Sequence, residues 1–385
     1  MVSTLKSEDE LIICSTRTNI DAETENRIKY LVNGELDWEY ILRTVSKHRI
    51  VPLFYSQINR LCPEDIPRHI RDVLKDQFKI NAYKNMMMLR ELLKLLNLFE
   101  SNGIIVVPYK GPVLAISIYK DIKLRQFVDL DIYVYEQDIS KVNEILLNEG
   151  YTPDFQIDES KKVKYNELRR DFSFFSESGV KIEIHKMFQS WVFSLPHGNS
   201  FLDKKTTLKI TRDKTIFNPS LENMILILSI HNAGHRWGLL YWICDLAELI
   251  RNSEYVDWKF IVEKAEKLVI KKILLINLHL LIDLYGIKLP VFVTEEFKKD
   301  NSIKKLANLF KESLFKKSSK NFTLTDELMI SIKTREKFIF GIRDCIKPIF
   351  TPTLYELKTL PLPPYLWSIY TIYRPLNLLF RYKIK

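Results

Sequence analysis

The sequence is poor in glycine and cysteine and has no long uninterrupted apolar run. Its 385 residues include ten glycines, and no low-complexity tract interrupts them. With 46% hydrophobic and 28% charged residues, the composition is typical of a globular protein and excludes a largely disordered chain. A chain of this length exceeds what a single hydrophobic core usually serves, so we expect subdomains.

The four cysteines exclude the commonest zinc and redox motifs. They are Cys14, Cys62, Cys244 and Cys345, and no two of them have the C-x-x-C spacing. The first ten residues are polar and acidic, where a signal peptide would need an apolar core. We therefore expect a reduced, cytoplasmic protein.

No segment is long and apolar enough to predict a transmembrane helix. The strongest run, 273–284, is short and contains His279 and Asp283. Residues 365–385 mix aromatic and basic side chains, which suits a helix lying on a membrane surface or a terminal helix docked on its own core. We expect docking, and peripheral membrane contact through the C-terminus is the alternative.

Hydrophobic periodicity predicts helices at both ends of the chain. Apolar residues recur at helical spacing through 81–101, and Gly103 follows as a stop signal. Helical spacing returns from about Pro219, through 222–250 and 258–285.

Between these helices the pattern changes to that of strands. Residues 104–107 form a short β-branched run, and Pro112 begins a helix that reaches about Tyr119. Alternation predicts a strand with one apolar face, then a helix capped by Asp138, then two strands joined by a tight turn. The first strand covers 127–135, the helix 138–149, and the last two strands 171–176 and 180–185. The fold class is thus α+β: a small mixed sheet with helices in 103–190, between helical regions 1–102 and 191–385.

Two of the predicted strands carry carboxylates opposite their apolar residues. Asp129 and Asp131 are two residues apart and share one side of their strand, and Glu183 alternates with Ile182 and Ile184 on another. Adjacent carboxylates repel unless a cation lies between them, and Mg²⁺ or Mn²⁺ suits such oxygen ligands. If the strands are neighbours, all three carboxylates meet, although Asp-x-Asp alone also arises by chance.

These residues occur in an order that resembles a known family. The segment 103–151 is similar to nucleotidyltransferases of the polymerase-beta-like superfamily, whose members read Gly-Ile, a strand, Leu-Lys-Gly, a helix ending in Tyr, Arg, Asp-Leu-Asp, and a helix ending in Gly-Tyr. The segment 181–188 resembles the family's carboxylate-x-His motif, and 231–250 its His-x-x-x-His and Trp-x-x-Asp-Leu signature. The likeness extends from about Trp38 to Tyr285.

The resemblance implies a catalytic site. Asp129, Asp131 and Glu183 match the acidic positions, and as catalytic residues they would hold the metal. Lys110-Gly111 replaces the Gly-Ser of better-known members, so Lys110 would supply positive charge and Gly111 would let the backbone approach phosphate. A solvated lysine is the alternative for Lys110.

Three further residues are candidate nucleotide ligands: Arg125, His185 and His235. Arg125 would pair with phosphate oxygens, or else form a salt bridge with the acidic cluster. His185 would contact nucleotide or only orient Glu183. His235 lies on the same helix face as His231. The two residues would contact the substrate or form a buried structural pair. A zinc site would need an adjacent glutamate, which this helix does not have.

The sequence predicts a metal-dependent nucleotidyltransferase. It would move a nucleoside monophosphate from a nucleoside triphosphate to a hydroxyl and release pyrophosphate. The net charge of +10 favours anionic partners without separating nucleotide, RNA and lipid, so RNA, a protein and a small molecule all remain open as acceptors. The alternative is an inactive nucleotide- or partner-binding module of the same fold.

Overall fold

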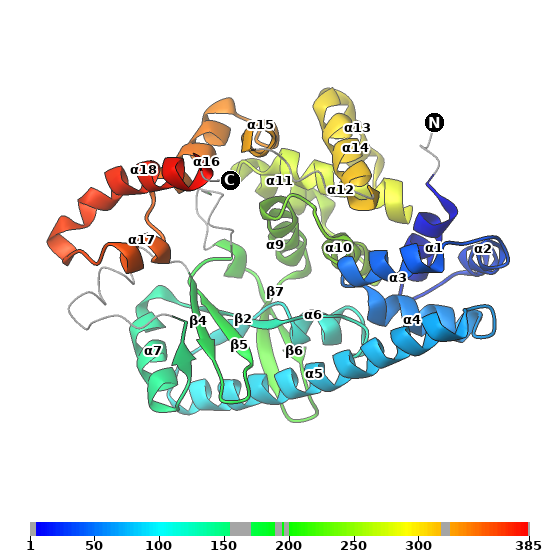
Figure 1. Ribbon diagram of the computed structural model, residues 1–385, viewed down its shortest axis with the longest axis horizontal. Helices are drawn as coiled ribbons and strands as arrows, with labels where there is room; N and C mark the ends of the chain where they lie inside the picture. The colour runs from blue at the N-terminus through cyan, green and yellow to red at the C-terminus, as the bar shows by residue number, and fades with distance from the viewer. Residues whose placement is uncertain (1–4, 155–170, 189–194, 196–199, 317–323, 384–385) are drawn as a thin grey trace.

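The structure is a computed structural model that describes residues 5–154, 171–188, 195, 200–316 and 324–383. Figure 1 shows a small sheet on one side of the molecule, with helices from the two ends of the chain around it. A single long helix, α5 (Arg68–Ser101), runs beneath the sheet and joins it to the first helices. The predicted α+β class with flanking helical regions is confirmed.

Four short helices precede α5, and acidic caps begin two of them. Asp21 accepts a hydrogen bond from the Thr24 backbone N–H at 2.7 Å, and Asp37 accepts one from Tyr40 at 2.8 Å. Such side chains satisfy backbone donors that lack partners in the first turn. The helices are α1 (Ser7–Ser15), α2 (Ala22–Val32), α3 (Trp38–Lys47) and α4 (Val51–Leu61).

The described residues form a five-stranded mixed sheet in the order β1-β2-β5-β4-β3. Strands β2 and β5 pair in parallel, and the other neighbours pair antiparallel. The strands are β1 (Val106–Pro108), β2 (Asp129–Val134), β3 (Thr152–Pro153), β4 (Asp171–Phe175) and β5 (Lys181–His185); helix α6 (Pro112–Ser117) precedes β2, and η1 (Glu136–Asp138) with α7 (Ile139–Asn148) follows it.

The two faces of the sheet belong to two hydrophobic clusters. Leu130 and Ile132 point to the cluster that contains the second half of α5 and helix α7. Tyr133 belongs instead to the cluster formed with the C-terminal helices, and its ring stacks on Phe188 at 4.5 Å between centroids. Strand β2 therefore has the one apolar face that the sequence predicted, and its other face carries Asp129 and Asp131 beside Tyr133. Val128, predicted to share that face, lies before the strand and is 51% exposed.

The C-terminal half contributes helices that cover the second face of the sheet, together with a hairpin that was not predicted. The hairpin pairs β6 (Lys205–Lys209) with β7 (Thr215–Pro219), after η2 (Ser200–Leu202). The helices that follow are α9 (Leu221–Gly234), α10 (Leu240–Arg251), α11 (Trp258–Lys267), α12 (Lys271–Tyr285), α13 (Val291–Lys299) and α14 (Asn301–Phe315).

Three local predictions need correction. The single helix predicted over 222–250 is two helices, because Arg236 and Trp237 adopt positive φ angles of 54° and 51° in the turn between them. Likewise Val269, with φ of 57°, divides 258–285 into α11 and α12. Asp138 stands at the start of α7 but makes no capping bond with its side chain, since it already belongs to the 3-10 turn before it.

The last part of the chain forms an arm of helices above the sheet in Figure 1. The predicted docking is confirmed for Trp367 and Tyr370, which are buried in the same cluster as α5 and α7. No helix in the described ranges has the length and apolar character needed to cross a bilayer. The elements are α15 (Leu324–Lys333), α16 (Phe338–Phe350), α17 (Leu354–Thr359), η3 (Pro364–Ile369) and α18 (Tyr370–Lys383).

Candidate functional site

The predicted carboxylates lie on one face of the sheet. In the parallel pair of β2 and β5, Asp131 is directly opposite Glu183, and Asp129 is opposite Lys181. Residues in register on adjacent strands point to the same side, as do residues two apart on one strand. Asp129, Asp131 and Glu183 therefore share the face opposite α5.

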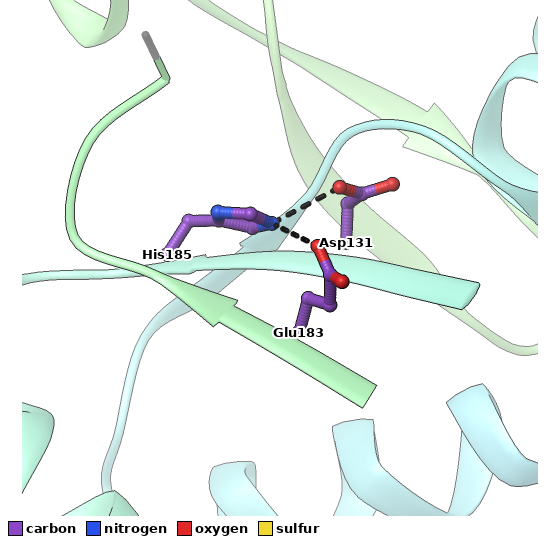
Figure 2. A group of neighbouring side chains, drawn as sticks. All are labelled: Asp131, Glu183 and His185. Atoms are coloured by element: carbon purple, nitrogen blue, oxygen red, sulfur yellow. Dashed lines mark hydrogen bonds and ion pairs between the residues drawn. The ribbon is translucent and has the colours of Figure 1, made fainter. Parts of the chain in front are cut away.

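Two of the carboxylates meet at a histidine. Figure 2 shows Asp131 and Glu183 projecting from adjacent strands toward the ring of His185. The His185 Nε2 atom lies 3.0 Å from Asp131 Oδ1 and 3.5 Å from Glu183 Oε2. Oxygen and nitrogen ligand atoms of these three residues are all within 4.8 Å of one another, which is close enough to share one metal ion.

Lysines complete the charge balance around this group. The Lys110 Nζ atom is 3.0 Å from Asp131 Oδ1, and Lys181 forms an ion pair with Glu183. Burial alone would raise the pKa of the Asp131 carboxyl, but Lys110 and His185 hold that pKa far below its usual range. Burial opposes ionisation of Glu183 too, yet the hydrogen bond from His185 leaves its pKa at about 2. Both groups are thus carboxylates at neutral pH.

The same contacts keep His185 charged. Burial alone would lower the pKa of His185, but its bonds to Asp131 and Glu183 raise that pKa to about 9. The imidazolium then donates from Nε2 to the carboxylates. The ring of Tyr109, which is buried, lies edge-on to it with centroids 5.8 Å apart.

Asp129 differs from the other two carboxylates. Among the described residues, no basic side chain forms an ion pair with it. Burial, with the negative charges of Asp131 and Glu183, raises the pKa of Asp129 to about 6. The charges of Lys110 and Lys181 only partly offset these effects, so a cation beside Asp129 would be favoured.

Gly111 has a steric reason to be glycine. Its φ of +52° is in the left-handed region, and a Cβ at this position would lie 3.0 Å from the backbone oxygen of Asp129. The Lys110-Gly111 turn thus lies against the first acidic residue. The Tyr109 backbone N–H adds a hydrogen bond of 3.2 Å to the carbonyl oxygen of Asp131. The turn and the acidic strand are held together by backbone contacts.

Residues 34–286 match the family model described as uncharacterised nucleotidyltransferase. The chain belongs to this family. The match covers the sheet, the Lys-Gly turn and the helices above the carboxylates, and it supports nucleotidyl transfer as the general chemistry of the fold. A search of curated proteins found no match.

In the structure, Arg125 pairs with a carboxylate other than the three predicted ones. Its guanidinium makes two hydrogen bonds of 2.8 Å to the carboxylate of Asp245 on α10, and Tyr119 donates a third to Asp245 at 2.7 Å. All three side chains are buried. Arg125 therefore links α10 to the segment before β2. The salt bridge that was the alternative to a phosphate contact does exist, but its partner is Asp245 and not the acidic cluster. A phosphate contact for Arg125 stays a prediction.

The pair His231 and His235 lies on the helical side of the site. Their ring centroids are 4.6 Å apart, and His235 stacks on Trp242 at 4.5 Å. Burial lowers the pKa of His231 well below its ordinary value and, with the nearby charge of Lys110, lowers that of His235, whose ring is more exposed. Both rings are neutral, so they can exchange hydrogen bonds but bring no charge to a phosphate.

The sequence interpretation missed Lys181 and Tyr109 at this site, and it singled out Trp242 only as part of the Trp-x-x-Asp-Leu signature. Lys181 could have been predicted from the sequence, because strand alternation places it on the same face as Glu183. Tyr109 adjoins the Lys-Gly turn, but nothing in its sequence context distinguishes it from a core tyrosine. Trp242 comes near His235 only because of the turn at 235–239, whose backbone angles the sequence does not predict.

Proposed function

We propose that this nucleotidyltransferase-family protein transfers a nucleoside monophosphate from a nucleoside triphosphate to an acceptor hydroxyl and releases pyrophosphate. One observation carries the proposal: Asp131 and Glu183 are in register on parallel neighbours, with Asp129 on the same face. Such a group suits a site for divalent cations and triphosphate. The family match makes nucleotidyl transfer the reaction to test first.

We infer that Asp129, Asp131 and Glu183 hold Mg²⁺ or Mn²⁺. Carboxylate oxygens are suitable ligands for both ions, and the raised pKa of Asp129 shows that nearby lysines only partly offset the negative charge at that end of the group. A cation bound there would displace the proton of the His185 Nε2 atom, and the neutral ring would then add a nitrogen ligand that Mn²⁺ accepts more readily than Mg²⁺. A bound divalent ion would neutralise phosphate charge and activate the acceptor hydroxyl.

The other proposed ligands act through charge and position. Lys110 is tied to Asp131, and a competing cation at that carboxylate would release its ammonium to contact phosphate. Gly111 holds the turn against β2, and Arg125 orients α10. His185 orients both carboxylates, and His235, stacked on Trp242, would contact the nucleotide as a neutral ring. Catalysis would then rest on positioning and charge neutralisation.

The acceptor and the location belong to the same proposal. The charge of +10 favours an anionic acceptor such as RNA, with a protein or small-molecule hydroxyl as alternatives. The four cysteines are free thiols, which suits a reducing compartment such as the cytoplasm.

Radiolabelled triphosphates test the proposal. The protein is incubated with each α-labelled triphosphate, Mg²⁺ or Mn²⁺ and a cell extract, and both labelled products and pyrophosphate are measured. We expect label transfer, and a decrease of at least about 100-fold in Asp131→Asn. The control is Asp121→Asn, which removes an exposed carboxylate paired with Lys123. No transfer with any triphosphate would reject the activity.

One observation favours an inactive binding module as a second candidate. Lys110, Lys181 and His185 already neutralise Asp131 and Glu183, as a metal ion otherwise would. Calorimetric titration with Mn²⁺ separates the two candidates. A module of this kind would bind Mn²⁺ equally in the wild type and in Asp131→Asn, whereas an enzyme site would lose affinity in the variant.

A further inference from the structure

Exposed apolar side chains gather in the last part of the chain. Nearly half of the large hydrophobic side chains that are exposed in the described residues fall between residues 329 and 380. Single exposed apolar residues are normal on a protein surface, but a concentration of them marks an interaction site. Helix α18 carries the most regular part of this concentration.

The exposed residues of α18 form one stripe. Ile372, Leu376, Leu379 and Phe380 follow helical spacing and are 68%, 49%, 62% and 68% exposed, respectively. Residues at these intervals lie on the same side of a helix. We call these four residues the α18 stripe.

The opposite side of α18 packs against the rest of the protein, so the stripe faces solvent. The Tyr370 hydroxyl is hydrogen-bonded to the backbone at 360 and 362, and Tyr370 is fully buried. Arg374 is also buried, and its guanidinium contacts the Glu356 carboxylate at 2.8 Å and the Pro348 carbonyl oxygen at 2.7 Å. Rotating the stripe inward would break this buried pair.

The sequence that contains the stripe can supply unpaired charge of one sign only, because it is rich in basic residues and lacks acidic ones. No aspartate or glutamate follows Glu356 in the sequence, whereas five basic residues do. Glu356 neutralises one of them, Arg374, through the ion pair already described. The other basic residues of this stretch of sequence are Lys358, Arg381, Lys383 and Lys385, and Arg381 and Lys383 fall at the C-terminal end of α18.

We propose that α18 binds the surface of an anionic membrane, with the α18 stripe in the interfacial region and the basic residues against lipid phosphates. An apolar row with adjacent cations matches an interfacial helix, and each cation adds attraction to anionic lipids. The same cations disfavour a second copy on this face, because two such segments would repel each other. The proposal is independent of nucleotidyl transfer.

Vesicle flotation of the full chain tests the proposal. We expect binding to vesicles of phosphatidylcholine mixed with phosphatidylglycerol, weaker binding to phosphatidylcholine alone, and release by added salt. The double variant Ile372→Asp with Leu379→Asp removes apolar area and adds negative charge, so its partition coefficient should fall roughly 100-fold. Absence of wild-type binding, or equal binding by the variant, overturns the proposal.

Two further measurements keep the result interpretable. Val291→Asp with Phe292→Asp is the matched control, since these residues are 74% and 50% exposed on α13, and it should bind vesicles like the wild type. Phe380→Trp reports depth without adding charge. Quenching of its fluorescence by brominated acyl chains supports insertion, and no quenching contradicts it. Sedimentation in which the wild type dimerises and the double variant does not assigns the stripe to a second copy and overturns the membrane proposal.

Discussion

Two histidines in different parts of the molecule, one buried and one partly buried, have opposite charge states. His48, at the junction of α3, α10 and α14, accepts a hydrogen bond from the Leu240 backbone N–H at Nδ1 and donates from Nε2 to the Leu314 carbonyl oxygen at 2.9 Å. Burial lowers its pKa to about 4. The His185 side chain is 15% exposed, and its carboxylate partners raise its pKa to about 9.

The difference separates a structural region from a functional one. At the helical junction, backbone groups satisfy both ring nitrogens and keep the imidazole neutral, so His48 acts as a structural tie. At the sheet, ionised groups of both signs are held close together at a cost in desolvation. A fold has little reason to gather such charges for stability alone, and perturbed groups of this kind are typical of functional sites.

The largest expected effect comes from removing Asp131. In Asp131→Asn, Lys110 and His185 both lose their carboxylate, so the free energy of unfolding should fall by about 3–5 kcal/mol at pH 7. The pKa of His185 should also fall, because Asp131 is the partner that raises it most. Urea unfolding measures the first change and NMR titration of the imidazole the second.

Asp121→Asn is the control for this comparison, and it should change stability by less than about 1 kcal/mol. If Asp131→Asn lowers the free energy of unfolding no more than this control does, the charges at the sheet are not coupled. The two regions would then not differ in the way described.

The pH dependence of stability should be opposite for the two histidines. For His48 the folded-state pKa of about 4 lies below the ordinary 6.5, so its contribution is present above pH 6.5 and is lost as pH falls toward 4. The loss is about 3 kcal/mol. For His185 the folded-state pKa of about 9 lies above 6.5, so its contribution is present below pH 6.5 and is lost as pH rises through 9.

Unfolding experiments at a series of pH values test this pair. His48→Asn should flatten only the acidic limb of the curve of stability against pH. His185→Gln should flatten the basic limb, and it should also change the acidic limb, because His185 holds the pKa values of Asp131 and Glu183 low. His69→Gln serves as the reference, since His69 is 71% exposed beside Glu39, and it should leave both limbs intact. An acidic limb unchanged in His48→Asn would show that His48 is not held neutral.

Divalent cations should stabilise only the charged region. At a concentration of 100 times the dissociation constant, Mn²⁺ or Mg²⁺ should raise the free energy of unfolding by about 2.7 kcal/mol through mass action. Thermal unfolding with and without EDTA measures the shift. The shift should disappear in Asp131→Asn and persist in His48→Asn, and an equal shift in both variants would place the cation elsewhere.

The smallest expected effect concerns the turn beside the carboxylates. Gly111→Ala should destabilise the protein by about 1–3 kcal/mol, because alanine is strained at positive φ and its Cβ would approach the Asp129 backbone. Gly150→Ala is the matched control, since Gly150 has φ of +83° but no neighbouring atom within 4 Å of its Cβ position. Equal losses in the two variants would mean that the contact with Asp129 contributes nothing.

The sequence was sufficient for the core of the site because strand alternation is a strict rule. Leu130 and Ile132 on one side of β2 required Asp129 and Asp131 on the other, and the same logic placed Glu183. The parallel pairing of β2 with β5 was only a condition in that argument, and the structure supplies it.

What the sequence could not supply depended on distant contacts. The pairing of Arg125 with Asp245 joins residues that are 120 positions apart, and no local pattern specifies it. The turn at 235–239 that brings Trp242 to His235 uses positive φ angles at Arg236 and Trp237, which side chains of this kind rarely adopt. The division into 1–102, 103–190 and 191–385 remains a prediction.

The length of helix α5 affects how the protein unfolds. Its 34 residues span about 51 Å. Ile70 and Leu74 lie in the cluster of the N- and C-terminal helices, while Leu92 and Phe99 lie against the sheet. One continuous helix thus packs in both hydrophobic clusters, so unfolding of either end should destabilise the other. A fragment that starts at the sheet would lack the helix that covers one face of that sheet.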